Sequence, residues 1–183
     1  MAAVLVLAAA AVPAPDASPA LQEMKVSRQG DQCVVSFTLV GGPSASMLEE
    51  IEAGIETSVN YRVQLHHRRP GLPDELLARR TVVTSARYDA LTRQYTLTRR
   101  LDGDLTETRV SSDAAEMRAF LTTLSGVPVA RAADLQTGET YYVRARGELG
   151  LVWRFYLIPW RQNTDWARVD IAAPVEAARD GGS

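Results

Sequence analysis

The sequence predicts an α+β fold made mainly of antiparallel β-strands, a sandwich-like sheet assembly with two amphipathic helices packed on it. Most of the chain alternates apolar and polar residues with the period of two that is typical of half-buried strands. Short turn signals separate these segments, and only two segments have helical spacing. Strands and helices do not alternate regularly, which argues against a doubly wound parallel sheet. We expect about seven or eight strands in a single globular domain over residues 21–173.

The first strand is expected over Leu21–Gln29, and a turn follows at Gly30 and Asp31. The second strand runs from this turn to Val40. Gly41 follows the second strand and ends it. The apolar residues that share one face of the second strand are Cys33, Val35, Phe37 and Leu39.

A first amphipathic helix is predicted over Ser46–Ile55. Ser46 and Glu49 have the spacing of a capping box, in which a hydroxyl and a carboxylate satisfy free amides at the helix start. Met47, Ile51 and Ile55 recur every four residues and would face the sheet.

The middle of the chain predicts four more strands. Alternating apolar residues from Val59 to Leu65 indicate the first, and a proline-rich break separates it from a strand over Arg79–Tyr88. Asp102 and Gly103 are the strongest hairpin signal, because both central positions of a type I′ turn need positive φ. The strands that this turn joins run through Tyr95, Leu97 and Leu101 and through Leu105 to Val110.

A second helix and a further strand follow. Ser112 or Asp113 is expected to cap the helix. Its apolar stripe consists of Ala114, Met117, Phe120, Leu121 and Leu124. The strand is indicated by alternation of Tyr141, Val143, Ala145 and Leu149 with polar residues.

The two ends of the chain have a different composition. The apolar run Met1–Val12 is shorter than the roughly 20 residues that span a bilayer, and small residues and prolines follow it. This pattern predicts a signal peptide at residues 1–20 and a periplasmic or secreted protein. The alternative is an alanine-rich N-terminus that is disordered or forms a buried helix. Residues 174–183 are expected to form a disordered tail.

Composition narrows the classes of ligand. A formal net charge of −2 argues against nucleic acid as the main partner, since binding phosphates requires a cationic excess. The single cysteine, Cys33, excludes an internal disulfide and a multi-cysteine metal site, and it is interpreted as a small buried apolar residue. Two histidines leave little material for a metal centre, so we expect no metal and no cofactor.

The chain is expected not to be an enzyme, because the nucleophile-elbow, P-loop and zinc-protease motifs are absent from the sequence. His66 and His67 point to opposite faces of a strand and cannot chelate one ion together. We expect His66 on the solvated face and His67 at the rim of the core. A small envelope hydrolase that depends on His67 remains an alternative, since triads assemble from distant positions.

Three arginine doublets are candidates for a surface that binds a partner or an anion. If the intervening strands pair as consecutive hairpins, the doublets share one end of the sheet. Guanidinium groups there would attract a carboxylate, a phosphate headgroup or an acidic protein surface. The alternative is a set of solvated edges whose charge nearby Asp and Glu residues offset. The residues of the doublets are Arg68, Arg69, Arg79, Arg80, Arg99 and Arg100.

The segment Leu151–Trp160 is a candidate docking block. It is too short to span a membrane, but its aromatic residues suit a peripheral contact with the membrane interface or a protein interface. The alternative is a last strand and loop that close the core. The aromatic residues of the block are Trp153, Phe155, Tyr156 and Trp160.

Several blocks of the sequence resemble a known family. They are Glu52–Ile55 followed by a strand that ends in His67-Arg68-Arg69, then Arg87–Tyr95, then Tyr141–Arg146, then Trp166. In this order they resemble the uncharacterised bacterial family called domain of unknown function number 4390, over roughly residues 24–171. The resemblance implies a short exported protein, often encoded beside a nitrogen-regulation-type sensor kinase. It implies no activity and no catalytic residues.

We therefore expect an exported, non-enzymatic binding domain whose partner is an envelope or membrane protein. A role beside a sensor kinase is implied by the resemblance alone. The main alternative is a carrier of a small apolar ligand, with its pocket between the helix Ser46–Ile55 and the sheet.

Overall fold

A computed structural model describes residues 18–154 and 158–171 of the chain. Residues 150–154 and 158–162 are described by their backbone alone. The predicted signal peptide therefore lies almost wholly outside the described residues, and the predicted tail at residues 174–183 lies entirely outside them.

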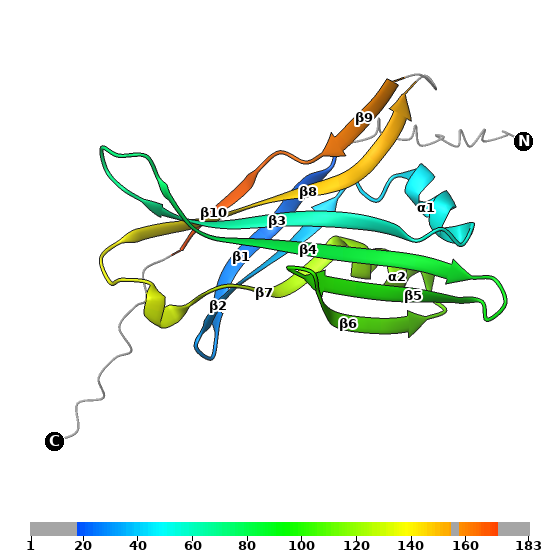
Figure 1. Cartoon of the computed structure of the whole chain (residues 1–183), viewed down its shortest axis with the longest axis horizontal. Helices are drawn as coiled ribbons and strands as arrows, with labels where there is room; N and C mark the ends of the chain where they lie inside the picture. Colours follow the sequence, from blue (N-terminus) through cyan, green and yellow to red (C-terminus); the bar gives the residue numbers. More distant parts are fainter. Residues whose placement is uncertain (1–17, 155–157, 172–183) are drawn as a thin grey trace, which may run out of the picture.

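Two antiparallel sheets make up most of the structure, which confirms the prediction of a mainly antiparallel α+β fold. The small sheet has the strand order β1-β2-β7, and the large sheet has the order β10-β8-β3-β4-β5-β6 with β9 added to β8 (Figure 1). The small sheet comprises β1 (Ala20–Gln29), β2 (Gln32–Val40) and β7 (Thr123–Arg131). The large sheet comprises β3 (Thr57–Arg68), β4 (Glu75–Asp89), β5 (Gln94–Leu101), β6 (Asp104–Ser111), β8 (Thr140–Arg154), β9 (Ile158–Asn163) and β10 (Ala167–Ile171).

The small sheet and the two helices cover the same face of the large sheet. Between the sheets lies one core, to which β3 contributes the buried residues Val59, Tyr61, Val63 and Leu65. Beside it, α1 (Ala45–Glu52) and α2 (Ala114–Thr122) pack on β4 and β5 around a second core. The buried residues of this second core include Ile51, Leu97, Met117 and Leu121. We call the covered side of the large sheet its inner face and the opposite side its outer face.

The β5–β6 turn has the conformation that its sequence predicts. Asp102 has φ 52° and Gly103 has φ 100°, as a type I′ turn requires. The Asp102 carboxylate accepts a hydrogen bond from the Thr81 amide at 2.8 Å and one from the Arg80 guanidinium at 2.9 Å. The turn is therefore also fixed to β4.

The first helix starts at a different cap from the one predicted. Ser44, and not Ser46, is the N-cap, and its hydroxyl accepts a hydrogen bond from the Met47 amide. The helix ends at Glu52, so Ile55 lies beyond it and is 55% exposed. Since Ser44 precedes the helix in an extended conformation, its hydroxyl can reach the first free amides.

The second helix is capped by Asp113, one of the two residues predicted. Its carboxylate accepts a hydrogen bond from the Ala115 amide at 2.8 Å. Leu124, expected at the end of the helical stripe, instead belongs to β7 and is buried between the sheets.

The described residues form ten strands, more than the seven or eight predicted. Neither β7 nor β10 was expected. β7 contains Gly126 and Pro128, which usually interrupt strands, but it lies at the edge of the small sheet, where the missing proline N–H costs no ladder bond. β10 is only five residues long and pairs with β8, from which β9 separates it in the chain.

Candidate functional site

The outer face of the large sheet carries a row of arginines. Arg144 on β8 pairs with Arg168 on β10 on one side and with Gln64 on β3 on the other. Gln64 in turn pairs with Arg79 on β4. Because paired residues of neighbouring strands share a face, one row across four strands holds three arginines.

A second row runs beside the first, two residues later on β8 and two residues earlier on β3. Arg146 on β8 pairs with Arg62 on β3. Glu148 forms ion pairs with both guanidinium groups, each at 3.0 Å, and accepts a hydrogen bond from that of Arg146. We call Arg62, Arg79, Arg144, Arg146 and Arg168 together the cationic face.

Trp166 holds part of the cationic face in place. The guanidinium of Arg144 lies 4.6 Å and that of Arg146 lies 5.4 Å from the centre of the Trp166 ring. Arg144 Nε also donates a hydrogen bond to Gln64 Oε1 at 2.8 Å. Two long side chains are thus partly ordered before any ligand arrives, which lowers the entropic cost of binding.

One end of the cationic face is closed by an aromatic stack. The rings of His66 and Tyr142 lie parallel with centres 5.0 Å apart, and the Arg168 guanidinium lies 3.6 Å from the Tyr142 ring. The Tyr142 hydroxyl donates to Asp74 at 2.8 Å. This hydrogen bond lowers the pKa of Asp74, so the carboxylate stays ionised and fixes the tyrosine.

His66 is buried in this stack, contrary to the expectation that it would be solvated. Its ring is covered because the strand opposite contributes Tyr142 to the same face. Burial lowers the pKa of His66, and Arg144 lowers it further. His66 is therefore a neutral packing residue at physiological pH, hydrogen-bonded to Gln64 at 3.2 Å.

The cationic face concentrates positive charge on a chain whose net charge is −2. Its five arginines have two carboxylates among them, Glu148 and Asp170. Asp170 pairs with Arg168 at 2.9 Å, whereas Arg144 has a neutral amide and an aromatic ring as neighbours. The face can therefore accept further anionic groups, which arginine binds through two parallel hydrogen bonds.

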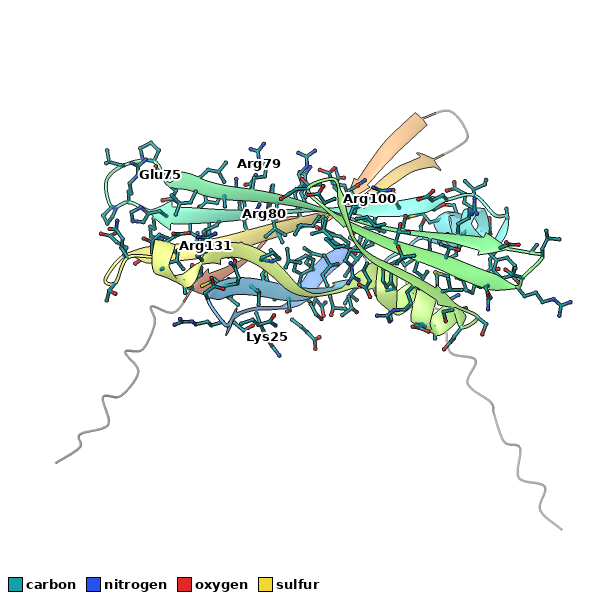
Figure 2. The ribbon with its side chains drawn as sticks, turned by 60° about the horizontal axis from the view of Figure 1, so that its bottom comes forward. Lys25, Glu75, Arg79, Arg80, Arg100 and Arg131 are labelled. Carbon is teal, nitrogen blue, oxygen red and sulfur yellow. The ribbon has the colours of Figure 1, made fainter. Side chains whose placement is uncertain are left out.

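The predicted doublets do not gather at one end of the sheet. Successive residues of a strand point to opposite faces, so Arg79 lies on the outer face and Arg80 on the inner one (Figure 2). Arg79 is exposed, while Arg80 is paired with Asp102 at 2.9 Å. Of this doublet, Arg79 alone belongs to the cationic face.

The doublet Arg68-Arg69 lies at the end of β3, four residues beyond the row of Arg144. Arg68 lies 4.0 Å from the Asp170 carboxylate and extends the cationic face weakly. Arg69 contacts Glu75 at 3.5 Å and donates to the Pro73 carbonyl at 3.2 Å, so it holds the β3–β4 connection.

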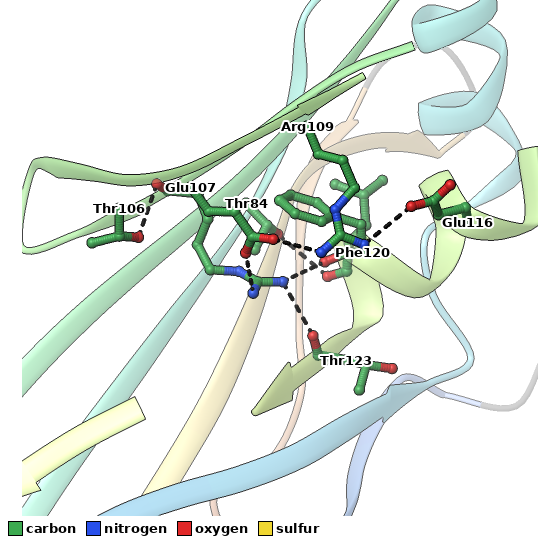
Figure 3. Close-up of polar contacts among 9 residues, drawn as sticks. Thr84, Thr106, Glu107, Arg109, Glu116, Phe120 and Thr123 are labelled. Carbon is green, nitrogen blue, oxygen red and sulfur yellow. Dashed lines mark hydrogen bonds and ion pairs between the residues drawn. The ribbon is translucent and has the colours of Figure 1, made fainter. Parts of the chain in front are cut away.

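Arg99 has a structural position on the inner face. It donates to Glu107 at 2.9 Å and to the carbonyls of Phe120 and Thr123 at 3.1 and 3.3 Å (Figure 3). Those carbonyls belong to the end of α2, where backbone acceptors have no intrahelical partner. Arg99 therefore ties α2 to the sheet and is not available to a partner. Arg100 lies on the outer face, where it donates to the Gly103 carbonyl at 3.4 Å.

Arg109 extends the same network. It pairs with Glu107 at 2.7 Å and with Glu116 in the first turn of α2 at 3.0 Å (Figure 3). Glu116 also accepts a hydrogen bond from Ser111 at 2.6 Å. Both ends of α2 are thus joined to β5 and β6 by charged hydrogen bonds.

The candidate docking block is described by its backbone alone, and its middle, residues 155–157, lies outside the described residues. Trp153 and Trp160 belong to the β8–β9 hairpin, in which Trp153 pairs with Pro159 and Trp160 with Val152, but only their backbone is described. Phe155 and Tyr156 lie outside the described residues. The hairpin itself projects away from β3 and the rest of the large sheet (Figure 1).

His67, the candidate base of the hydrolase alternative, is engaged elsewhere. Its Nε2 lies 2.8 Å from the Glu139 carboxylate, and its ring packs on Tyr141 with centres 4.9 Å apart. Cys33 is buried, as predicted. Among the described residues, no three His, Cys, Asp or Glu side chains lie close enough together to hold a metal ion.

The five arginines of the cationic face include one predicted candidate, Arg79. The other four were not singled out, although two signals were in the sequence. Arg144 and Arg146 alternate with apolar residues, and Arg62 occupies the polar side of the Val59–Leu65 strand. What sequence reasoning lacked was the pairing of β8 with β3 and with β10.

The family model described as "Domain of unknown function (DUF4390)" matches residues 16–151. The chain belongs to this family. The match confirms the resemblance, although it ends at residue 151 rather than near residue 171. Four of the five arginines of the cationic face lie within the part that matches DUF4390, and Arg168 follows it.

No curated protein and no solved structure shows significant similarity to this DUF4390 chain. In the part of the chain that the structure describes, no helix is long and apolar enough to cross a membrane.

Proposed function

We propose that this protein is an exported, non-catalytic binding domain whose cationic face docks on an acidic surface of a membrane-protein partner. The observation that carries the proposal is the row of Arg168, Arg144 and Arg79 on the outer face of the large sheet, which no element of the described residues covers. Guanidinium groups held at fixed spacing bind carboxylates with both affinity and geometric selectivity.

A protein surface fits this face better than a phosphate polymer or a lipid headgroup layer. Glu148 and Asp170 lie among the arginines and would repel a uniformly anionic surface. A protein can place basic residues opposite these two carboxylates and acidic residues opposite the arginines. The mixed pattern therefore favours a specific protein partner over non-specific anion binding.

The N-terminal sequence supports the exported part of the proposal. An apolar run of about a dozen residues is followed by small residues and prolines, the pattern of a cleaved secretory signal. Edman sequencing of the protein purified from its own cells tests it. A mature N-terminus near residue 20 together with recovery outside the cytoplasm is expected, and an intact Met1 in the cytoplasm would contradict it.

The non-catalytic part of the proposal rests on the two histidines. His66 is stacked on Tyr142, and His67 is paired with Glu139 and packed on Tyr141. Both imidazole rings thus make contacts that hold the fold together. Among partners, a membrane-bound sensor kinase is the class that the family resemblance suggests.

Site-specific photocrosslinking in cells tests the docking surface. A photoreactive residue replaces Thr81, which pairs with Arg62 at the edge of the cationic face. The control position is Gln22, exposed on the small sheet. We expect a crosslink to one membrane protein from position 81 and none from position 22. No adduct from position 81, or the same adduct from both positions, would overturn the proposal.

A further inference from the structure

A cavity of about 520 Å³ lies between the two sheets, where β1 of the small sheet passes β10 of the large one. Its volume falls in the range of about 300–1,000 Å³ that is usual for small-molecule sites. The cavity is not at the predicted position beside α1, where Met47 and Ile51 are buried in the two cores. Six of its apolar lining residues are Met24, Val26, Cys33, Leu135, Val169 and Ile171.

Within the described residues, the apolar walls of this cavity are incompletely covered. Met24, Val26, Val169 and Ile171 are only partly buried, although each packs against the core between the sheets. Apolar side chains on facing strands normally bury one another. Filling the cavity with an apolar chain would remove this surface from water, which favours binding.

The charged group best placed at the cavity is Arg28. It pairs with Cys33 across the β1–β2 ladder, so the two residues share one face of the small sheet, and both line the cavity. Arg28 Nε donates to the Gly30 carbonyl at 2.9 Å, which anchors the guanidinium at the β1–β2 turn; its other N–H groups have no hydrogen-bond partner among the described residues. Of the other charged lining residues, Asp170 is paired with Arg168, and Lys25 points away from the large sheet (Figure 2).

We propose that this cavity is a binding site for a single-chain amphiphile, with the apolar chain between β1 and β10 and an anionic headgroup at Arg28. A medium-chain fatty acid is the simplest molecule with this chemistry. A lysophospholipid shares it, with a phosphate in place of the carboxylate. None of the five arginines of the cationic face lines this cavity, so the proposal can be tested independently of the docking proposal.

Alkylation of the one cysteine of the chain reports directly on the cavity. Cys33 lines it, and burial raises the pKa of its thiol, so iodoacetamide reacts slowly but at a single position. We expect saturating laurate to slow alkylation of the full chain at least about tenfold by occupying the cavity. An unchanged rate would overturn the proposal. A parallel experiment with lauroyl-lysophosphatidic acid shows whether the site prefers a phosphate or a carboxylate headgroup.

Two variants separate the apolar site from the headgroup site. Val26→Trp fills the cavity and should abolish the effect of laurate on Cys33, and Ala132→Phe at the same cavity is a second test if the first variant folds poorly. Arg28→Gln should weaken laurate binding about tenfold and leave binding of the neutral dodecanol unchanged. Arg87→Gln, at an exposed arginine of β4, is the matched control. Equal laurate affinity in the Arg28 and Arg87 variants would overturn the headgroup assignment.

Discussion

The guanidinium of Arg144 lies 4.6 Å from the centre of the Trp166 ring, and this contact joins the cationic face to the loop between β9 and β10. Thr164 places the loop: its hydroxyl accepts a hydrogen bond from the Gly147 amide at 2.9 Å, and its own amide donates to the Gly147 carbonyl at 2.9 Å. Trp166 is therefore positioned by two hydrogen bonds between Thr164 and Gly147, on the same strand that carries Arg144.

A double-mutant cycle measures this contact. Arg144→Ala and Trp166→Ala are each expected to lower the free energy of unfolding, and the double variant should lose less than the sum, by a coupling of about 0.5–1 kcal/mol. Urea denaturation of the four proteins gives the coupling. Additive losses would mean that the ring and the guanidinium do not stabilise each other.

Replacing Arg99 should lower the free energy of unfolding more than replacing Arg79. Arg99→Gln removes charged hydrogen bonds to Glu107 and to the end of α2, and should cost about 2 kcal/mol of unfolding free energy. Arg79→Gln should cost less than about 0.5 kcal/mol, because Arg79 is exposed on the outer face. Urea denaturation curves of the two variants measure both losses. Similar losses in both variants would contradict the assignment of Arg99 as structural and Arg79 as surface.

The stability of the fold should fall as the pH drops below neutral, because of His66. Burial, with Arg144 and Arg168 adding to it, lowers the pKa of His66 in the folded protein below 6.5, although Asp74 acts in the opposite direction. The unfolded chain therefore takes up this proton first, and stability is lost as the pH falls from 6.5 to the folded pKa. Below the folded pKa both states are protonated and this loss stops growing.

Proton NMR titration of the ring checks the position of that pKa, and a His66 ring that titrates at or above 6.5 would contradict it. His66→Phe keeps an aromatic ring on Tyr142 but cannot titrate. Its unfolding free energy should therefore depend less on pH than that of the wild type between about pH 7.5 and pH 5.5.

Tyr61 links β3 to the end of α2. Its buried hydroxyl donates to the Leu121 carbonyl at 2.7 Å, and Thr84 donates to the same carbonyl at 3.3 Å. Tyr61→Phe should cost about 1 kcal/mol, since Thr84 still satisfies the carbonyl. Adding Thr84→Val leaves Leu121 without either donor, so the double variant should lose more than the sum of the single variants. Calorimetry measures both, and strict additivity would contradict a shared acceptor.

Local patterns were sufficient to predict most elements of the fold. Alternation identified β3 because its inner residues, such as Val59 and Leu65, are buried while its other face is polar. The positive φ of Asp102 and Gly103 follows from the turn chemistry of those two residues. β7 was missed because it contains Pro128, which a strand tolerates at the edge of a sheet. Local sequence does not reveal which strand will lie at an edge.

The candidate site was harder to predict, because adjacency in sequence is a poor guide to adjacency on a sheet. Arg79 and Arg80 are neighbours in the chain but lie on opposite faces of β4. Arg62, Arg144 and Arg168 are far apart in the chain but meet on three paired strands. Which strands pair is decided by packing of the whole domain, so the cationic face emerges only with the topology.

The central claim is that the cationic face binds an acidic surface of a membrane protein. The decisive measurement is the yield of the crosslink from position 81 in two variants with the same net charge. Arg144→Glu with Arg79→Glu reverses two charges of the face, while Arg93→Glu with Arg118→Glu reverses two exposed charges elsewhere. We predict a loss of the crosslink of about tenfold or more in the first variant and little change in the second. Equal yields in the two variants would contradict the claim.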